Sequence, residues 1–267
     1  MRIIEFRIFM PMKLQMCRAA SKYSVNRQTQ EHTGGGDGFE IVEAKNYVDS
    51  GQPGRYIYRI LHCKNKLPSG IRWAVPEKYA HIHEHNRNSF PHYEGDFTIP
   101  AMGDSFVLQT QTNHYEYQKG KEIPFNLNGW NDDELKDREI YYLDILDGPA
   151  SKKKELDLHG YSCPEIGMDE LIGSKKRKSD DQKIPRWVDN YEGPMTLIVK
   201  TVKFRFKWFG AQTMVEKFVG STWYQVYLDT HRAMLKWAPN WHNLLDDDLI
   251  KLENKTKEQL SEHQFDI

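Results

Sequence analysis

The sequence predicts an α+β fold in which long helices cover one face of a curved, mostly antiparallel β-sheet. Strand-like segments follow one another from Phe39 to about Thr112, with glycine- and proline-rich breaks between them. Helical patterns gather instead towards the two ends of the chain. Such a fold can enclose a cavity between sheet and helix, and we expect residues 1–267 to form it as a single domain.

The chain opens with one strand and one helix. Residues 2–10 alternate in polarity with a period of two, which favours a strand. Residues 13–33 have no β-branched run and place their apolar side chains at helical spacing. We therefore expect a helix there, with an apolar side formed by Leu14, Cys17 and Ala20.

After the central meander, two more strands and an irregular segment are expected. Residues 140–146 and 196–209 are strand-like. Residues 151–193 are polar and rich in charge, and they offer few apolar positions. We interpret residues 151–193 as irregular surface structure rather than as a domain boundary.

Two helices are predicted near the C-terminus. The first begins after Gly210, and one side of it is formed by Val215, Phe218, Val219, Thr222, Val226, Ala233 and Trp237. The second lies within residues 245–267 and begins near three aspartates, which suit the positive end of a helix dipole. Its apolar stripe consists of Leu249, Leu252, Thr256 and Leu260.

Composition excludes several classes of protein. A formal net charge of -1 argues against binding to nucleic acid or to an anionic membrane through overall charge, so membrane contact must be local. The start of the chain does not resemble a signal peptide, and no segment approaches the roughly 20 apolar residues of a membrane span. The three cysteines share no metal-ligand spacing, and we expect a cytosolic protein.

Two cations stand among apolar residues of predicted strands. Alternation places Lys200 on one face with Ile198 and Val202, and Arg59 on one face with Ile57. An ammonium in such a place needs a buried carboxylate or a ligand phosphate, unless it reaches water at the end of the sheet. A solvated face would explain Arg59 nearly as well. Two such cations are what a pocket for an anionic headgroup with apolar chains requires.

Aromatic residues at the end of the last strand suggest membrane contact. Trp208 and Phe209 lie beside basic side chains, an arrangement that suits insertion at a bilayer interface. Packing in the core is the alternative for this pair.

Enzyme and metal motifs are weak or missing. His81, His83 and His85 would share a strand face, but a zinc site needs a further ligand and no HExxH or paired-cysteine motif is present, so no metal is expected. The basic run 175–178 is interpreted as a solvated loop. The sequence has no nucleophile elbow, phosphate-binding glycine loop or dinucleotide fingerprint, so neither catalysis nor a cofactor is expected.

A series of motifs resembles the phosphatidylinositol transfer protein family, in the family's order and over residues 1 to about 262. The resemblance is weakest at residues 115–130 and 151–193. The motifs are the first strand with Pro11, Tyr23-Ser24-Val25, Thr33-Gly34-Gly35-Gly36-Asp37-Gly38, Ile82-His83-Glu84, Asn88 with Pro91, Tyr142-Leu143-Asp144-Ile145, Val202-Lys203-Phe204, Trp208-Phe209-Gly210, Thr230-His231-Arg232 and Thr256-Lys257-x-Gln259-Leu260.

The resemblance implies a helix-grip, START-like fold that holds one phospholipid head-inward, as cargo rather than as a cofactor. It implies a monomeric, cytoplasmic carrier that touches membranes transiently, exchanges phosphatidylinositol or phosphatidylcholine, and closes its cavity with the C-terminal helix. A non-exchanging lipid sensor and a hydrolase using the same cavity are the alternatives. Carried over by position, headgroup contacts fall on Ile57, Arg59, Asn88, Lys200 and Glu253, with Thr112 near the phosphate, Tyr93 in the lipid pocket, and Trp208 and Phe209 docking on the membrane.

Three positions depart from the inositol-selective members of the family. Ile57 stands where those members have a threonine, so it has no hydroxyl for inositol. Arg59 replaces a lysine, and Tyr93 replaces a cysteine of the lipid pocket. The headgroup preference among inositol lipid, phosphatidylcholine and phosphatidic acid therefore stays open. Glu253 also has an alternative role, as an i,i+4 partner of Lys257 on an exposed helix face.

Overall fold

The structure is a computed structural model that describes residues 1–33, 37–66, 76–173, 180, 182–207 and 212–261, with only the helical backbone described for 212–221. Its described part contains one eight-stranded sheet in the order β2-β3-β4-β5-β6-β8-β1-β7. All neighbouring strands are antiparallel except β1 and β7, which are parallel. The strands are β1 (Arg2–Met10), β2 (Gly38–Asp49), β3 (Gln52–His62), β4 (His81–Ser89), β5 (His92–Thr98), β6 (Phe106–Tyr117), β7 (Arg138–Leu143) and β8 (Met195–Phe206).

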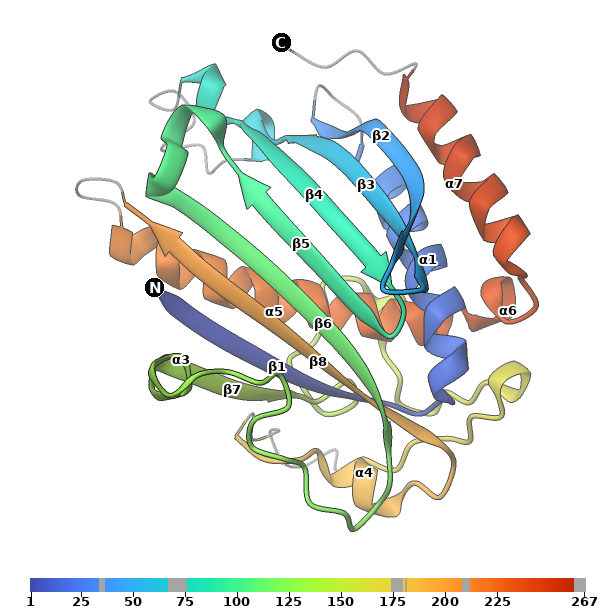
Figure 1. The fold of residues 1–267 in the computed structure, drawn as a ribbon. Helices are drawn as coiled ribbons and strands as arrows, with labels where there is room; N and C mark the ends of the chain where they lie inside the picture. The colour runs from blue at the N-terminus through green and yellow to red at the C-terminus, as the bar shows by residue number, and fades with distance from the viewer. Residues whose placement is uncertain (34–36, 67–75, 174–179, 181, 208–211, 262–267) are drawn as a thin grey trace.

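The long helices α1, α5 and α7 lie on one face of this sheet (Figure 1). The longest, α5 (Gln212–Lys236), crosses behind the strands. Helices α1 (Leu14–Glu31) and α7 (Asp246–Ser261) pack against each other beside β2. Short helices complete the set: α3 (Asp132–Asp137), α4 (Arg186–Asn190) and α6 (Ala238–Trp241). Within the described segments, no helix combines the length and the hydropathy that crossing a bilayer would require. The predicted α+β class, with a mostly antiparallel sheet, is confirmed.

Strand alternation decides which side chains face α5, and this side is called the inner face. On β1 the inner face carries Phe6, whose ring packs edge-on against Tyr224 and Tyr227 of α5. On β8 it carries Val202, which is 1% exposed. Burial of each such side chain contributes about 1.5–3 kcal/mol, so the contact between sheet and α5 is a main source of stability.

Two details differ from the sequence prediction because polar groups have local partners. Val226, expected on the buried side of α5, is 44% exposed, and the neighbouring Tyr227 and His231 are buried instead. His231 can be buried because its Nδ1 donates to the Tyr227 carbonyl oxygen at 2.6 Å. The strand predicted at 140–146 ends at Leu143, because the Asp144 carboxylate accepts from backbone N–H groups and forms a turn.

The segment 151–193 is irregular but not confined to the surface. It contains short 3-10 turns and the five-residue α4, as expected from its composition. It also inserts Leu158, Met168 and Trp187 into the main core, each at most 2% exposed. The expectation that residues 151–193 lie at the surface is therefore wrong for these side chains, because a few widely spaced apolar residues are enough to anchor a polar segment in the core.

Candidate functional site

A cavity of about 460 Å³ lies between α1, α7 and the inner face of β2, β3 and β4. This volume falls in the range of roughly 300–1,000 Å³ that is typical of ligand pockets. The cavity is smaller than the space expected for a whole diacyl lipid, so it suits the headgroup end of such a molecule. Apolar side chains such as Leu249 and Ile250 of α7 close it on one side.

Five residues predicted as headgroup or pocket residues line this cavity. They come from four different elements, since β3, β4, the start of β5 and α7 all contribute to the lining. The five are Ile57, Arg59, Asn88, Tyr93 and Glu253. Their proximity in the fold is established, whereas their role towards a lipid stays a prediction.

Thr112 and Lys200 lie outside that lining but on the same inner face. Tyr93 is the register partner of Thr112 on β6, and Thr112 is the register partner of Lys200 on β8. A continuous row of side chains therefore runs from the cavity to Lys200. Trp208 and Phe209 lie outside the described residues, so the membrane-docking prediction is not examined by the structure.

Arg59 is held by a carboxylate on the neighbouring strand. Its Nη2 donates to Glu84 Oε1 at 2.8 Å, and its Nε donates to Oε2 of the same residue. Nη1 donates to Thr29 Oγ1 at 3.1 Å, and the guanidinium lies 4.5 Å from the Phe39 ring centroid. The charge of Arg59 is therefore compensated by the protein, with Glu84 only 5% exposed.

Lys200 is in the opposite electrostatic situation. Its Nζ donates to Thr112 Oγ1 at 3.4 Å and lies 5.0 Å from the centroid of the Tyr227 ring. Throughout the segments that the structure describes, no carboxylate forms an ion pair with it. Burial lowers the pKa of the Lys200 ammonium to about 8. The site thus contains a partly buried cation that forms no ion pair with a carboxylate of the described residues.

Two buried histidines near Lys200 are neutral at physiological pH. Burial and the Lys200 charge lower the pKa of His231 to about 3. Burial is also the main cause that lowers the pKa of His114 to about 4. Because a carbonyl oxygen can only accept, His114 Nδ1 donates to the Pro91 carbonyl at 2.9 Å. Neither imidazole therefore adds positive charge to the Lys200 site.

Glu253 of α7 is paired with a residue that the sequence analysis did not select. Arg55 of β3 donates to Glu253 Oε1 from Nε at 2.9 Å and from Nη2 at 2.5 Å. The alternative pairing of Glu253 with Lys257 is therefore wrong. Arg55 could have been found, because alternation along β3 places it on the same face as Ile57 and Arg59.

Tyr93 and Asn88 offer polar groups to the cavity. The Tyr93 ring packs edge-on against His114, with centroids 5.2 Å apart, and burial raises the pKa of its hydroxyl. Among the residues placed by the structure, none is hydrogen-bonded to the Tyr93 hydroxyl or to the Asn88 side-chain amide. Both groups can therefore bond to a ligand at no cost to the protein's own hydrogen bonds.

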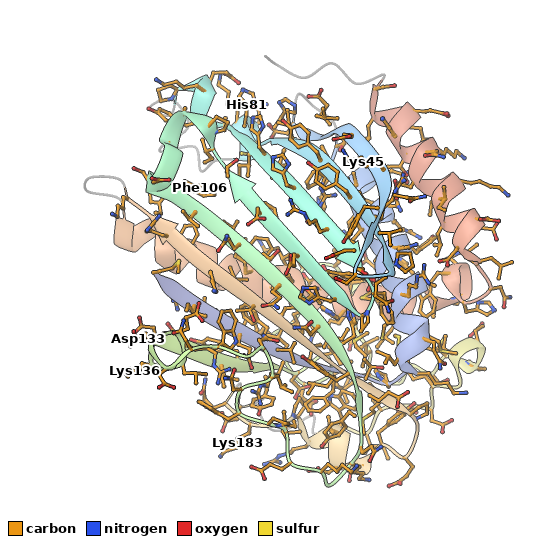
Figure 2. All side chains as sticks on the ribbon, in the orientation of Figure 1. Lys45, His81, Phe106, Asp133, Lys136 and Lys183 are labelled. Carbon is orange, nitrogen blue, oxygen red and sulfur yellow. The ribbon has the colours of Figure 1, made fainter. Side chains whose placement is uncertain are left out.

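The histidines of β4 lie on the outer face, away from the cavity. Figure 2 labels His81 at the start of β4 and Lys45 on β2, on the side of the sheet opposite α5. His83 and His85 stack on Tyr58, and His83 Nδ1 lies 2.7 Å from the Tyr58 hydroxyl. In the described portion of the chain, no group of three or more potential metal ligands is gathered. These histidines form a stacked aromatic surface.

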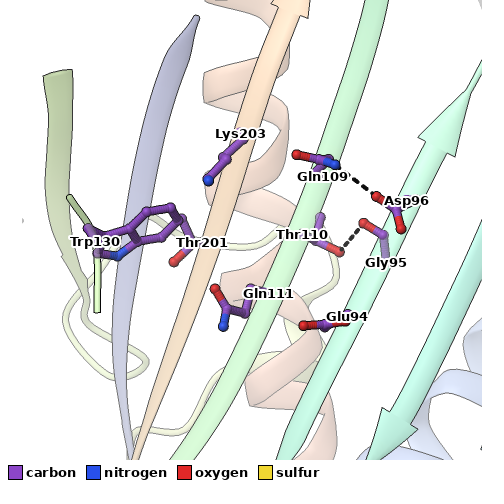
Figure 3. Close-up of a pocket in the computed structure, with 9 residues that line it drawn as sticks. All are labelled: Glu94, Gly95, Asp96, Gln109, Thr110, Gln111, Trp130, Thr201 and Lys203. Carbon is purple, nitrogen blue, oxygen red and sulfur yellow. Dashed lines mark hydrogen bonds between the residues drawn. The ribbon is translucent and has the colours of Figure 1, made fainter. Parts of the chain in front are cut away.

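A second hollow, of about 250 Å³, lies on this outer face (Figure 3). Its lining is mainly polar, with Glu94 and Asp96 on one side and Trp130 and Lys203 on the other. Lys203 Nζ lies 4.3 Å from the Trp130 ring and donates to Glu134 at 2.5 Å. Such a lining cannot shelter acyl chains, so the inner cavity remains the candidate lipid site.

A curved, mostly antiparallel sheet with a long helix on one face is consistent with a START-like lipid-binding fold. The chain belongs to the phosphatidylinositol transfer protein family, because the model of that family matches residues 1–258. The predicted resemblance is thereby confirmed.

Individual relatives agree with this assignment. The chain is 29% identical to the phosphatidylinositol transfer protein beta isoform of Bos taurus over 262 residues, which cover 97% of this chain and 93% of the relative. It is 28% identical to the beta isoform of Homo sapiens over the same shares of both chains. It is also 28% identical to phosphatidylinositol transfer protein 1 of Dictyostelium discoideum, over 97% of this chain and 94% of the relative.

Proposed function

We propose that this protein binds one phospholipid, phosphatidylinositol or phosphatidylcholine, with its headgroup in the inner cavity, and exchanges it between membranes without chemical change. The observation that carries the proposal is Lys200, a partly buried cation on the inner face without a carboxylate partner in the described chain. A lipid phosphate supplies the missing negative charge, and the Thr112 hydroxyl beside Lys200 supplies a further hydrogen bond.

In this proposal the remaining site residues contact different parts of the headgroup. Asn88 and Tyr93 bond to it with groups that have no partner in the described protein, and Glu253 contacts it from α7. Ile57 gives an apolar patch on β3 between two arginines. Arg59 is already bound to Glu84, so it lines the cavity but neutralises the phosphate charge less than Lys200 does.

The acyl chains lie along the inner face in this proposal. Exposure of about 30 methylenes to water costs roughly 0.8 kcal/mol each, so unassisted transfer faces a barrier on the order of 20 kcal/mol. A sheet-and-helix interior removes that exposure. Because the observed cavity fits only a headgroup, loading requires α5 or α7 to move away from the sheet and admit the chains.

Exchange takes place at a membrane surface. Trp208 and Phe209 are proposed to enter the headgroup layer and hold the open protein on the bilayer. The protein acts as a cytoplasmic monomer that binds to membrane surfaces only transiently. It uses no cofactor, since the phospholipid is its cargo, and it has no nucleic acid partner.

Transfer between two vesicle populations tests the proposal. Donor vesicles carry labelled phosphatidylinositol or phosphatidylcholine, acceptor vesicles carry none, and the acceptors are analysed by mass spectrometry. Net movement of intact lipid is the expected result. Release of a hydrolysed product would show an enzyme instead, and binding without movement would show a lipid sensor.

A further inference from the structure

We propose that Arg55 is a specificity-determining residue of the inner cavity. By binding the carboxylate of Glu253, it disfavours a polyhydroxyl headgroup, that of an inositol phospholipid, relative to a choline headgroup. This inference rests on the proposed function and names which headgroup the same site prefers.

The contact between Arg55 and Glu253 is close and largely shielded from water. Arg55 Nε and Nη2 both donate to Glu253 Oε1, at 2.9 and 2.5 Å, while Nη1 donates to Asn46 Oδ1 at 3.1 Å. The two charged side chains are only 17% and 13% exposed. Charge-assisted hydrogen bonds in such surroundings are among the stronger polar contacts of a protein.

Position in the sheet brings this pair to the headgroup end of the cavity. Arg55 is the register partner of Asn88, and it lies two residues from Ile57 on the same face of β3. Arg55, Asn88, Ile57 and Glu253 all line the cavity. A headgroup that reaches Asn88 therefore also reaches the Arg55–Glu253 pair.

The hydrogen bonds that this pair can offer do not suit a polyol. Hydroxyl groups of inositol donate most strongly to a free carboxylate. Two guanidinium donors of Arg55 occupy Oε1 of Glu253 and compensate its charge, which makes Oε2 a weaker acceptor as well. Ile57 adds no hydroxyl beside it, and Glu84, a carboxylate on the neighbouring strand β4, is bound by Arg59. A choline group does not require a hydrogen-bond acceptor, because its quaternary ammonium has no N–H or O–H group to donate.

The net charge of the pair does not decide the preference. Arg55 and Glu253 neutralise each other in a contact that is largely shielded from water, so the pair neither attracts nor repels a choline cation strongly. A choline group approaches any carboxylate through its methyl groups, which carry no strong donor, whereas an inositol hydroxyl can donate a hydrogen bond. The difference between the two headgroups therefore lies in the hydrogen bonds that Glu253 can accept.

Competitive loading of the protein tests this inference. The protein is incubated with vesicles of equimolar phosphatidylinositol and phosphatidylcholine, re-isolated, and its bound lipid is measured by mass spectrometry. Arg55→Gln should raise the inositol-to-choline ratio roughly tenfold, the effect of one charge-assisted hydrogen bond gained by the headgroup. Arg87→Gln is the matched control, since Arg87 of the neighbouring strand β4 also binds a carboxylate, Asp96 at 3.6 Å, but does not line the cavity. Its ratio should stay within about twofold of wild type.

A double-mutant cycle separates this role from a general structural one. In a Glu253→Ala background, Arg55→Gln should leave the ratio unchanged, because the carboxylate that it releases is missing. If Arg55→Gln does not fold, Arg55→Lys serves in its place, with a smaller rise expected from the lost second contact.

The outcomes are distinct. An unchanged ratio in a folded Arg55 variant, or a rise that persists without Glu253, overturns the role of Arg55 and leaves the carrier function standing. A wild-type protein that loads and moves neither lipid overturns the proposed function itself.

Discussion

Lys200 of β8 and Thr112 of β6 are register partners, and the Lys200 ammonium donates a hydrogen bond to the Thr112 hydroxyl at 3.4 Å. This hydroxyl is the hydrogen-bond acceptor that the described protein provides for a partly buried cation. The arginines of the cavity are different, since Arg55 and Arg59 are both bound to carboxylates. The inner face thus separates compensated arginines near the headgroup end from an uncompensated lysine further along the sheet.

Replacement of Lys200 by methionine should abolish lipid loading and stabilise the protein. The charge is costly where it stands, so its removal is expected to raise the free energy of unfolding by about 1–3 kcal/mol. Bound lipid is measured by mass spectrometry and stability by urea unfolding. Lys203→Met is the matched control, because Lys203 lies on the outer face of the same strand and is bonded to Glu134. The control should load normally, and normal loading by Lys200→Met would exclude Lys200 as the phosphate ligand.

The double replacement of Trp208 and Phe209 by alanine should slow transfer without emptying the cavity. If both rings dock on the bilayer, their loss weakens membrane residence, whereas bound lipid per protein stays constant. Transfer rates between vesicles and sedimentation with vesicles measure the two effects. A fall in unfolding free energy of 3 kcal/mol or more would instead identify the pair as core residues.

The faces of the strands could be predicted from the sequence, but the partners of the cavity residues could not. A period of two placed Lys200 and Arg59 on the inner face, because alternation is a local property of a strand. The contact between Arg55 and Glu253 joins residues 198 positions apart, and no local pattern encodes it. The sequence therefore indicates which residues enter the cavity, while the fold decides which of their charges are compensated.

Helix α5 shows a second limit of predicting burial from the sequence. An apolar stripe predicted burial of Val226, yet the buried side of α5 includes His231 and Arg232. Arg232 tolerates burial because it donates to three backbone carbonyls, among them Ile145 O at 2.7 Å and Pro149 O at 2.7 Å. Polarity alone misassigns Arg232, since its hydrogen-bond acceptors come from a distant part of the chain.

Replacement of Ile57 by threonine should increase the share of inositol lipid that is loaded. Ile57 lines the cavity between the compensated arginines, and a hydroxyl there could bond to an inositol hydroxyl. One neutral hydrogen bond predicts a gain of about threefold to tenfold in the inositol-to-choline ratio. Ile57→Val is the control, because valine has the shape of threonine without its hydroxyl. An equal rise in both variants would assign the effect to cavity size.

Lipid loading should weaken as the pH rises above 8. The pKa of Lys200 is lowered by burial to about 8, so the ammonium is charged at pH 7 and loses its proton above pH 8. A bound phosphate favours the charged form and raises this pKa, so binding above pH 8 takes up a proton and affinity falls by up to tenfold per pH unit. Burial raises the pKa of Tyr93 and of Tyr227, which keeps both phenols neutral in this range.

Equilibrium loading measured from pH 7 to pH 9.5 would show this dependence. Lys200→Arg provides the comparison, because a guanidinium keeps its charge throughout this range and should give a flat profile. The two profiles together attribute the decline to one side chain, since every other titrating group is common to both proteins. A wild-type profile as flat as that of Lys200→Arg would mean that phosphate binding does not depend on the Lys200 charge. The headgroup would then have to be held from the Arg55 end of the cavity.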